Sequence, residues 1–170
     1  MVPLVTGTGN SQRCFLSAKF LVLGELAFNV KIGRVVQSSP WQPFRWQVLE
    51  MGPVDVPMPQ GMDERVQAIN VEVYQDQLQG YFLNLDTDTP FIFFGVRYPE
   101  DNKTLMPSIF DATFSYDEAA RWMDSNEEVQ TLPLPAPVAS WLAELVQAKY
   151  QPEPKQRRRP QSFIKPEERS

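Results

Sequence analysis

The sequence contains no histidine and a single cysteine, Cys14. Histidine is the side chain whose ordinary pKa lies near neutrality and the commonest ligand for zinc, copper and non-haem iron, so its absence excludes Ser-His-Asp, Cys-His and His-metal chemistry. One cysteine cannot form an internal disulfide, a four-cysteine zinc site or an iron–sulfur cluster. We therefore expect no metal, no cofactor and no catalytic residue, and we interpret the protein as a non-enzyme.

Long uninterrupted apolar runs are also missing. The most apolar stretch near the N-terminus, residues 15–28, is interrupted by Lys19 and Glu25 and is followed by no small-residue cleavage site. It is too short and too charged to cross a bilayer. We therefore expect a cytoplasmic protein without a membrane partner, and we interpret residues 1–29 as a poorly ordered leader or an over-extended gene start.

The net charge of −5 hides an uneven distribution along the chain. Residues 1–150 carry 10 Lys and Arg against 18 Asp and Glu, whereas residues 151–170 carry 6 against 3. The acidic body would repel a phosphate backbone, so nucleic acid is not an expected partner of the domain. The last segment is rich in proline, glutamine and charge, and residues 151–170 are predicted to be a flexible basic tail.

Sixteen prolines divide the chain into short segments. Between them, apolar residues alternate with polar ones or form short continuous runs, a pattern typical of strands. Short polar turns favour antiparallel pairing of these strands. The pattern predicts strands at residues 30–36, 44–50, 66–74, 78–85, 91–96 and 105–113.

Helix signals appear only after the strands. Ser115 and Glu118 have the spacing of a capping box and predict a short helix from Ala119 to Met123. A second helix is predicted to begin near Pro137, because apolar residues then recur at helical spacing. The predicted fold is α+β: a single domain over residues 30–150, with about six mostly antiparallel strands forming a sandwich or partial barrel, then two helices packed on it and a disordered C-terminal tail.

The acidic pairs of the sequence fall in predicted turns. A carboxylate in a turn is usually solvated or caps the turn, and nothing in the sequence sets two of them across a cleft. We interpret them as surface residues, and a small carboxylate-dependent hydrolase remains an alternative. The pairs are Asp86/Asp88, Glu100/Asp101 and Glu127/Glu128.

Two tryptophans stand close together at the entrance to a predicted strand. Trp46 shares parity with Phe44 and Val48, which favours the core, whereas Trp41 follows Pro40 outside the alternating run. For Trp41 the sequence therefore leaves two alternatives about equally open, which are packing in the core and a partly exposed role as an interface anchor. The arginines Arg157, Arg158 and Arg159 either keep the tail soluble or contact an acidic partner.

The order of several short motifs resembles a bacterial family of unknown function that is encoded beside molybdenum- or tungsten-dependent formate dehydrogenases. The resemblance runs from about Lys31 to Lys165, and no single motif carries it. The chain departs from the family in two respects. The leader before Val30 has no counterpart in the family, and the basic cluster expected after Lys165 is replaced by Pro-Glu-Glu-Arg, with the arginines displaced to residues 157–159. The motifs are Gly33-Arg34-Val35-Val36, Pro40-Trp41-Gln42 with Trp46, Tyr81-Phe82-Leu83-Asn84-Leu85, Val96-Arg97, Glu118-Ala119, Pro133-Leu134-Pro135 and Phe163-Ile164-Lys165.

This resemblance implies an accessory role in the production or assembly of formate dehydrogenase. The implied partner is a formate dehydrogenase subunit or its dedicated chaperone, and no catalytic residue carries over. Two alternatives stay open: the carboxylate-dependent hydrolase, and a nucleic-acid-linked regulator acting through the tail. The candidate partner-binding residues are Trp41, Trp46, Arg157, Arg158, Arg159, Phe163 and Lys165.

Overall fold

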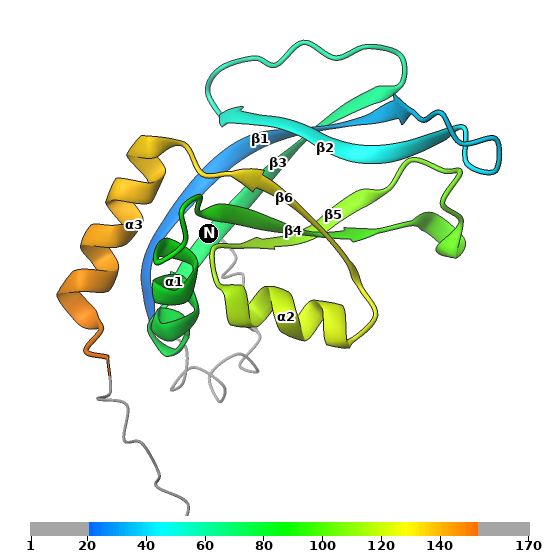
Figure 1. Cartoon of the computed structure of the whole chain (residues 1–170). Coiled ribbons are helices and arrows are strands. Elements are labelled where there is room, and N and C mark those ends of the chain that lie inside the picture. The colour runs from blue at the N-terminus through cyan, green and yellow to red at the C-terminus, as the bar shows by residue number, and fades with distance from the viewer. Residues whose placement is uncertain (1–20, 153–170) are drawn as a thin grey trace, which may run out of the picture.

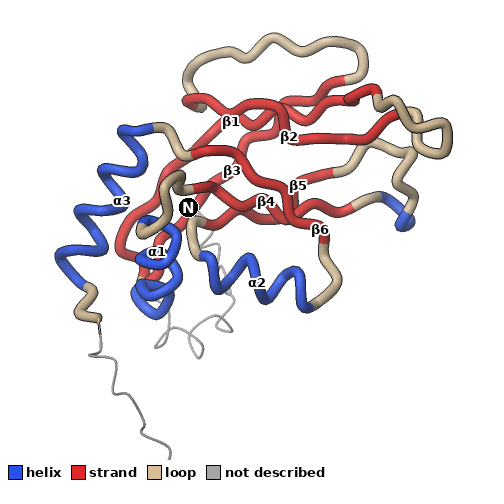
Figure 2. Tube along the Cα trace, in the orientation of Figure 1, coloured by secondary structure: helices blue, strands red, loops and turns tan. Residues whose placement is uncertain are grey.

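A computed structural model describes residues 21–152 as two antiparallel sheets with three helices packed around them (Figure 1). Figure 2 shows the strands gathered in the body and the helices at one end and along one face. Short 3-10 turns at Gln75–Gln77 and Pro99–Asp101 complete the described structure. The elements are β1 (Val22–Val36), β2 (Phe44–Pro53), β3 (Glu64–Tyr74), α1 (Leu78–Leu85), β4 (Phe91–Arg97), β5 (Ser108–Thr113), α2 (Tyr116–Asp124), β6 (Glu128–Pro133) and α3 (Ala136–Lys149).

Each sheet has three strands with the longest or most apolar strand in the middle. The first has the order β2-β1-β3 and the second the order β5-β4-β6, with every pairing antiparallel. On β1 the alternation places Phe28, Val30 and Ile32 inside. On β4 the same parity buries Ile92, Phe94 and Val96, so the core lies between the two sheets.

The sheets also meet along their edges, where β3 lies beside β5 and β2 beside β6. The strands in these two seams are not paired through their backbones. Instead, the side-chain amide of Gln67 bonds to both the N–H and the C=O of Ile109, and Gln130 bonds to β2. The two three-stranded sheets, joined at both seams, form a partial barrel, which is one of the two arrangements that the sequence left open.

The helices cover what the sheets leave open. Ser115 caps α2 by accepting from the N–H of Glu118, as the capping box predicts. The α2 helix covers the outer face of the β4 sheet, where Trp122 packs against Phe110 with ring centroids 5.5 Å apart. The α3 helix packs Trp141 onto β1 at Gly24, where an added Cβ would lie 2.8 Å from the indole.

The predicted α+β class is confirmed, with six antiparallel strands and helices packed on them. One predicted strand was wrong, because residues 78–85 form helix α1. The apolar residues of this run also recur at the helical spacing of Leu78, Tyr81 and Leu85, so its alternation was ambiguous. Leu78 and Tyr81 are buried, while Leu83 remains 40% exposed.

The start of β1 and the presence of β6 also differ from the prediction, and the ends of several other strands shift by two or three residues. Strand β1 begins at Val22, so residues 22–29 belong to the sheet and not to a poorly ordered leader. Their pairing with β3 outweighs the charge of Glu25, which lies opposite Glu72 at the sheet surface. Strand β6 was missed because it is a short edge strand without a strongly apolar face. The rest of the predicted leader, residues 1–20, and residues 153–170 of the predicted tail lie outside the described residues.

Candidate partner-binding site

The turn between β1 and β2, residues 37–43, presents Trp41 to solvent. The N–H of Gln37 donates to the C=O of Pro43 at 2.8 Å and closes the turn. Pro40 and Pro43 restrict the backbone on both sides of the tryptophan. The side chain is 95% exposed, so Trp41 does not pack in the core, and its role as an interface anchor stays a prediction.

Other apolar side chains gather at the same end of the sheet. Val36 ends β1 and is 80% exposed, and Met62, in the loop before β3, is fully exposed. That loop is joined to β1 by the N–H of Arg34, which donates to the C=O of Asp63 at 3.1 Å, and by an ion pair between the same two residues. We call Val36, Trp41 and Met62 the apolar tip.

Trp46 has a different environment from Trp41. It is 7% exposed, packs edge-on against Phe44, and donates through Nε1 to the C=O of Thr104 at 3.4 Å. Trp46 thus joins β2 to the loop after β4. It is a core residue that contributes to a binding surface only through the hollow that it lines.

A hollow of about 450 Å³ lies over the β2–β6 seam, beside the apolar tip. We call it the seam hollow. Two residues of the β1–β2 turn, Gln37 and Gln42, form part of its wall and connect it to Trp41. The remaining wall is made by Arg45, Trp46, Gln47 and Val48 of β2, by Glu128, Val129, Gln130 and Thr131 of β6, and by Tyr98 and Lys103.

Glu128 is the best-satisfied charge of the seam hollow. Its carboxylate accepts from Tyr98 at 3.0 Å, from Lys103 at 3.0 Å and from Gln130 at 2.9 Å. Burial alone would raise the pKa of Glu128, but these hydrogen bonds and the Lys103 charge outweigh it and lower the pKa below its usual range. Arg45, by contrast, is exposed and forms no ion pair with any residue that the structure describes.

A second hollow of about 270 Å³ contains three carboxylates. We call it the carboxylate hollow, lined by Glu72, Asp111 and Glu118 with Tyr74 and Trp122 among its other residues. The Tyr74 hydroxyl donates to Glu72, and this bond, with burial and the negative charges nearby, raises the pKa of Tyr74 to about 12. Burial raises the pKa of Asp111, and the Glu72 charge adds to that effect.

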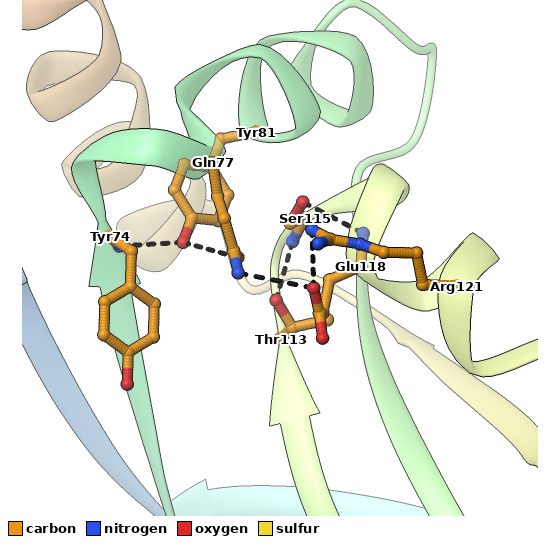
Figure 3. A network of polar contacts seen from close by, with 7 residues as sticks. All are labelled: Tyr74, Gln77, Tyr81, Thr113, Ser115, Glu118 and Arg121. Atoms are coloured by element: carbon orange, nitrogen blue, oxygen red, sulfur yellow. Dashed lines mark hydrogen bonds and ion pairs between the residues drawn. The ribbon is translucent and has the colours of Figure 1, made fainter. Parts of the chain in front are cut away.

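The third carboxylate, Glu118, belongs to a polar network between α1, β3 and α2 (Figure 3). It pairs with Arg121 at 2.7 Å and accepts from Gln77 Nε2 at 3.4 Å. The buried Tyr81 hydroxyl donates to Gln77 and accepts from the N–H of Tyr74 at 2.9 Å. Glu118 is therefore held in a structural role at the edge of the carboxylate hollow.

The acidic pairs singled out in the sequence do not meet in the carboxylate hollow. Glu128 lines the seam hollow, and Glu127 pairs with Arg97 at the surface. Two of the three carboxylates that do share a hollow, Glu72 and Asp111, come from neighbouring strands that the sequence does not show to be adjacent. Within residues 21–152, no three His, Cys, Asp or Glu side chains form a group that could hold a metal ion.

The sequence of this chain matches a known protein family. Residues 27–159 match the family described as Protein of unknown function (DUF3305). The chain belongs to this DUF3305 family. The match includes every described helix and all strands from Ala27 onward, with both tryptophans of the candidate site. No curated protein and no solved structure matches the chain.

The remaining candidate residues of this DUF3305 protein lie outside the described residues. Arg157, Arg158 and Arg159 fall at the end of the family match, whereas Phe163 and Lys165 lie beyond it. None of the helices described in residues 21–152 is long and apolar enough to cross a bilayer.

Proposed function

We propose that this DUF3305 protein is a non-enzymatic accessory factor that binds a partner protein at the apolar tip and the seam hollow. The proposed partner is a formate dehydrogenase subunit or its dedicated chaperone. The proposed partner is the one that the family resemblance implies, which rests on the order of all its motifs. The exposure of the apolar tip and the position of the seam hollow support the choice of binding surface.

One observation carries the binding function: Trp41 is 95% exposed, at the same end of the sheet as two other exposed apolar side chains. Single exposed apolar residues are ordinary on protein surfaces. A turn that holds a whole indole in water, however, leaves a large apolar area exposed, which is unfavourable in the free protein. Buried aromatic side chains at the centre of an interface supply a large share of its binding energy. A partner that covers Trp41 would recover this energy.

The charge distribution supports a protein partner. The acidic body, with 10 basic and 18 acidic residues in positions 1–150, is poorly suited to contact DNA or RNA. Deletion of the gene should therefore lower active formate dehydrogenase while leaving transcription of its subunits unchanged.

A capture experiment tests the proposal. The full chain, immobilised, should retain a formate dehydrogenase subunit or its chaperone, and Trp41→Ala should weaken capture by about 2 kcal/mol or more. Tyr116→Ala is a matched control, because Tyr116 is an exposed aromatic residue at the start of α2. Normal formate dehydrogenase activity in the deletion strain, with neither protein co-purifying, would remove the proposed function.

A second candidate function is the carboxylate-dependent hydrolase. Its support is that Glu72 and Asp111 line one hollow and that burial, with a further contribution from the Glu72 charge, raises the pKa of Asp111. A raised carboxyl pKa is what a general acid requires. Turnover of chromogenic glycosides or esters that is lost in both Glu72→Gln and Asp111→Asn would favour the hydrolase over the accessory factor.

A further inference from the structure

Within residues 21–152, one side chain makes the hydrogen bonds that join β2 to β6. Gln130 on β6 accepts from the N–H of Val48 at 2.7 Å and donates to the C=O of Trp46 at 3.1 Å. A glutamine amide carries the same donor and acceptor as a peptide group. Gln130 therefore occupies, on the edge of β2, the place that one peptide unit of a neighbouring strand would take.

The edge of β2 offers more than these two groups. In an antiparallel pair, the N–H and C=O of alternate residues point away from the partner strand. Because the C=O of Trp46 and the N–H of Val48 face β6, the other peptide groups of these two residues face the same way. An extended chain lying along β2 could therefore form further hydrogen bonds, with the backbone N–H and C=O groups of β2 that Gln130 leaves unbonded.

The charge of the seam hollow differs from that of the body. Its carboxylate, Glu128, already accepts three hydrogen bonds, one of them from Lys103. Arg45 lines the same hollow without an ion-pair partner in the described part of the chain. In an otherwise acidic protein this hollow therefore has an uncompensated positive charge, which is complementary to a carboxylate on a ligand.

We propose that the seam hollow receives an extended, acidic peptide segment of the partner protein. The segment pairs with the edge of β2, takes over the two hydrogen bonds of Gln130, and places a carboxylate against Arg45. This inference rests on the proposed binding function and adds the kind of segment that the partner presents. The hollow, at about 450 Å³, has the size of a site for a short stretch of chain, and Gln37 and Gln42 lead from it to Trp41.

Selection from a phage library of random dodecapeptides on the full chain tests this inference without a known partner. The selected peptides should be enriched in Asp and Glu, and the best synthetic peptide should slow hydrogen exchange at the N–H of Trp46. Arg45→Glu should weaken its binding about tenfold or more, the effect expected for a charge-assisted contact. Lys149→Glu, a charge reversal at the end of α3, should leave it unchanged.

Two variants of β6 separate the seam from a general charge effect. Thr131→Trp, at an exposed position lining the hollow, should fill it and abolish peptide binding while the protein remains folded. Gln130→Ala should bind the peptide at least as tightly as the unchanged protein, because the peptide no longer has to displace the amide. Peptides that bind equally well to Arg45→Glu and Thr131→Trp, or a library that yields no binder, would overturn the inference.

The two proposals fail separately. Capture of a formate dehydrogenase subunit that depends on Trp41 but is indifferent to Arg45→Glu and Thr131→Trp would leave the proposed function standing and remove the peptide site. Seam-dependent binding of acidic peptides, in a protein whose deletion leaves formate dehydrogenase unaffected, would support the peptide site and remove the proposed partner.

Discussion

Gln67 and Gln130 stand on different strands and perform the same task at opposite seams of the barrel. Each uses its side-chain amide to bond with both a backbone N–H and a backbone C=O of the strand across the seam. Gln67 bonds to the N–H and the C=O of one residue, Ile109, whereas Gln130 bonds to the N–H of Val48 and the C=O of Trp46. Two glutamines thus connect sheets that share no backbone pairing.

The first prediction follows from this arrangement. Gln67→Met and Gln130→Met keep the length of the side chain but remove its hydrogen bonds, leaving partly buried peptide groups without partners. Each should lower the free energy of unfolding by about 1–3 kcal/mol. Urea denaturation measures the loss, and Gln79→Met on the exposed face of α1 is the control. Seams that tolerate both methionines without loss would mean that core packing alone joins the sheets.

Much of the fold could be predicted from the sequence because most strands have one buried face. The alternation through Val30 and Ile32 and the continuous run around Phe94 follow directly from burial on one or both faces. The prediction of a strand from Leu78 to Leu85 failed because the aromatic and apolar residues of this run fit both the two-residue period of a strand and the 3.6-residue period of a helix. Contacts with distant parts of the chain decide how this run is buried. The side-chain amide of Asn84, for example, bonds to backbone groups of Phe91 and Phe114.

Less of the candidate site could be predicted. The exposed position of Trp41 was one of two readings, and the prolines around it were the useful signal. Arg45 and Gln130 have no local signal at all, because their positions in the seam hollow depend on β6 lying beside β2, and β6 itself was missed. The carboxylates Glu72 and Asp111 likewise meet only through the β3–β5 seam.

Truncation of the two tryptophans should affect stability very differently. Trp46→Ala removes a buried indole and its bond to Thr104, and should cost about 3–5 kcal/mol of unfolding free energy. Trp41→Ala removes a side chain in solvent and should change stability by less than about 0.5 kcal/mol. Thermal and urea denaturation of both variants provide the measurement. A clear loss of stability in Trp41→Ala would show that the turn packs against the body.

Asp111 gives a prediction for pH. Burial, with the Glu72 charge, raises its pKa in the folded state, so its ionisation opposes folding as the pH rises through the carboxyl range. Asp111→Asn should therefore be more stable than the unchanged protein at pH 7, by less than about 1 kcal/mol because Asp111 is only partly buried and solvent screens its charge. The difference should shrink below about pH 4, where the carboxyl is protonated in both states. In a Glu72→Gln background the gain should be smaller, and an equal gain would rule out coupling of the two carboxylates.

Removal of the last residues should leave the domain folded. A chain ending at Gln151 keeps all described strands and helices, including the contact between Phe82 and Tyr150, whose ring centroids are 5.2 Å apart. A segment that buries little apolar surface adds little stability, so cooperative unfolding should be nearly unchanged. A large fall in the urea midpoint would instead show that Phe163 and Ile164 pack against the domain.

The arginines of the tail should act on association and not on folding. Reversing Arg157, Arg158 and Arg159 to Glu gives the tail the sign of the acidic body and removes attraction to an acidic partner. Charges that are not buried mainly set the association rate, and at physiological ionic strength they are screened within about 8 Å. Capture of the partner should therefore fall chiefly at low salt, whereas Trp41→Ala should weaken capture at every salt concentration, because burial of an indole does not depend on screening. Surface plasmon resonance across a salt series separates the two effects.

Two outcomes would contradict this prediction. A loss of capture in the reversed variant that persists at high salt would mean that these arginines form desolvated contacts. Salt-dependent binding of arbitrary DNA duplexes by the unchanged tail would instead favour the nucleic-acid-linked regulator.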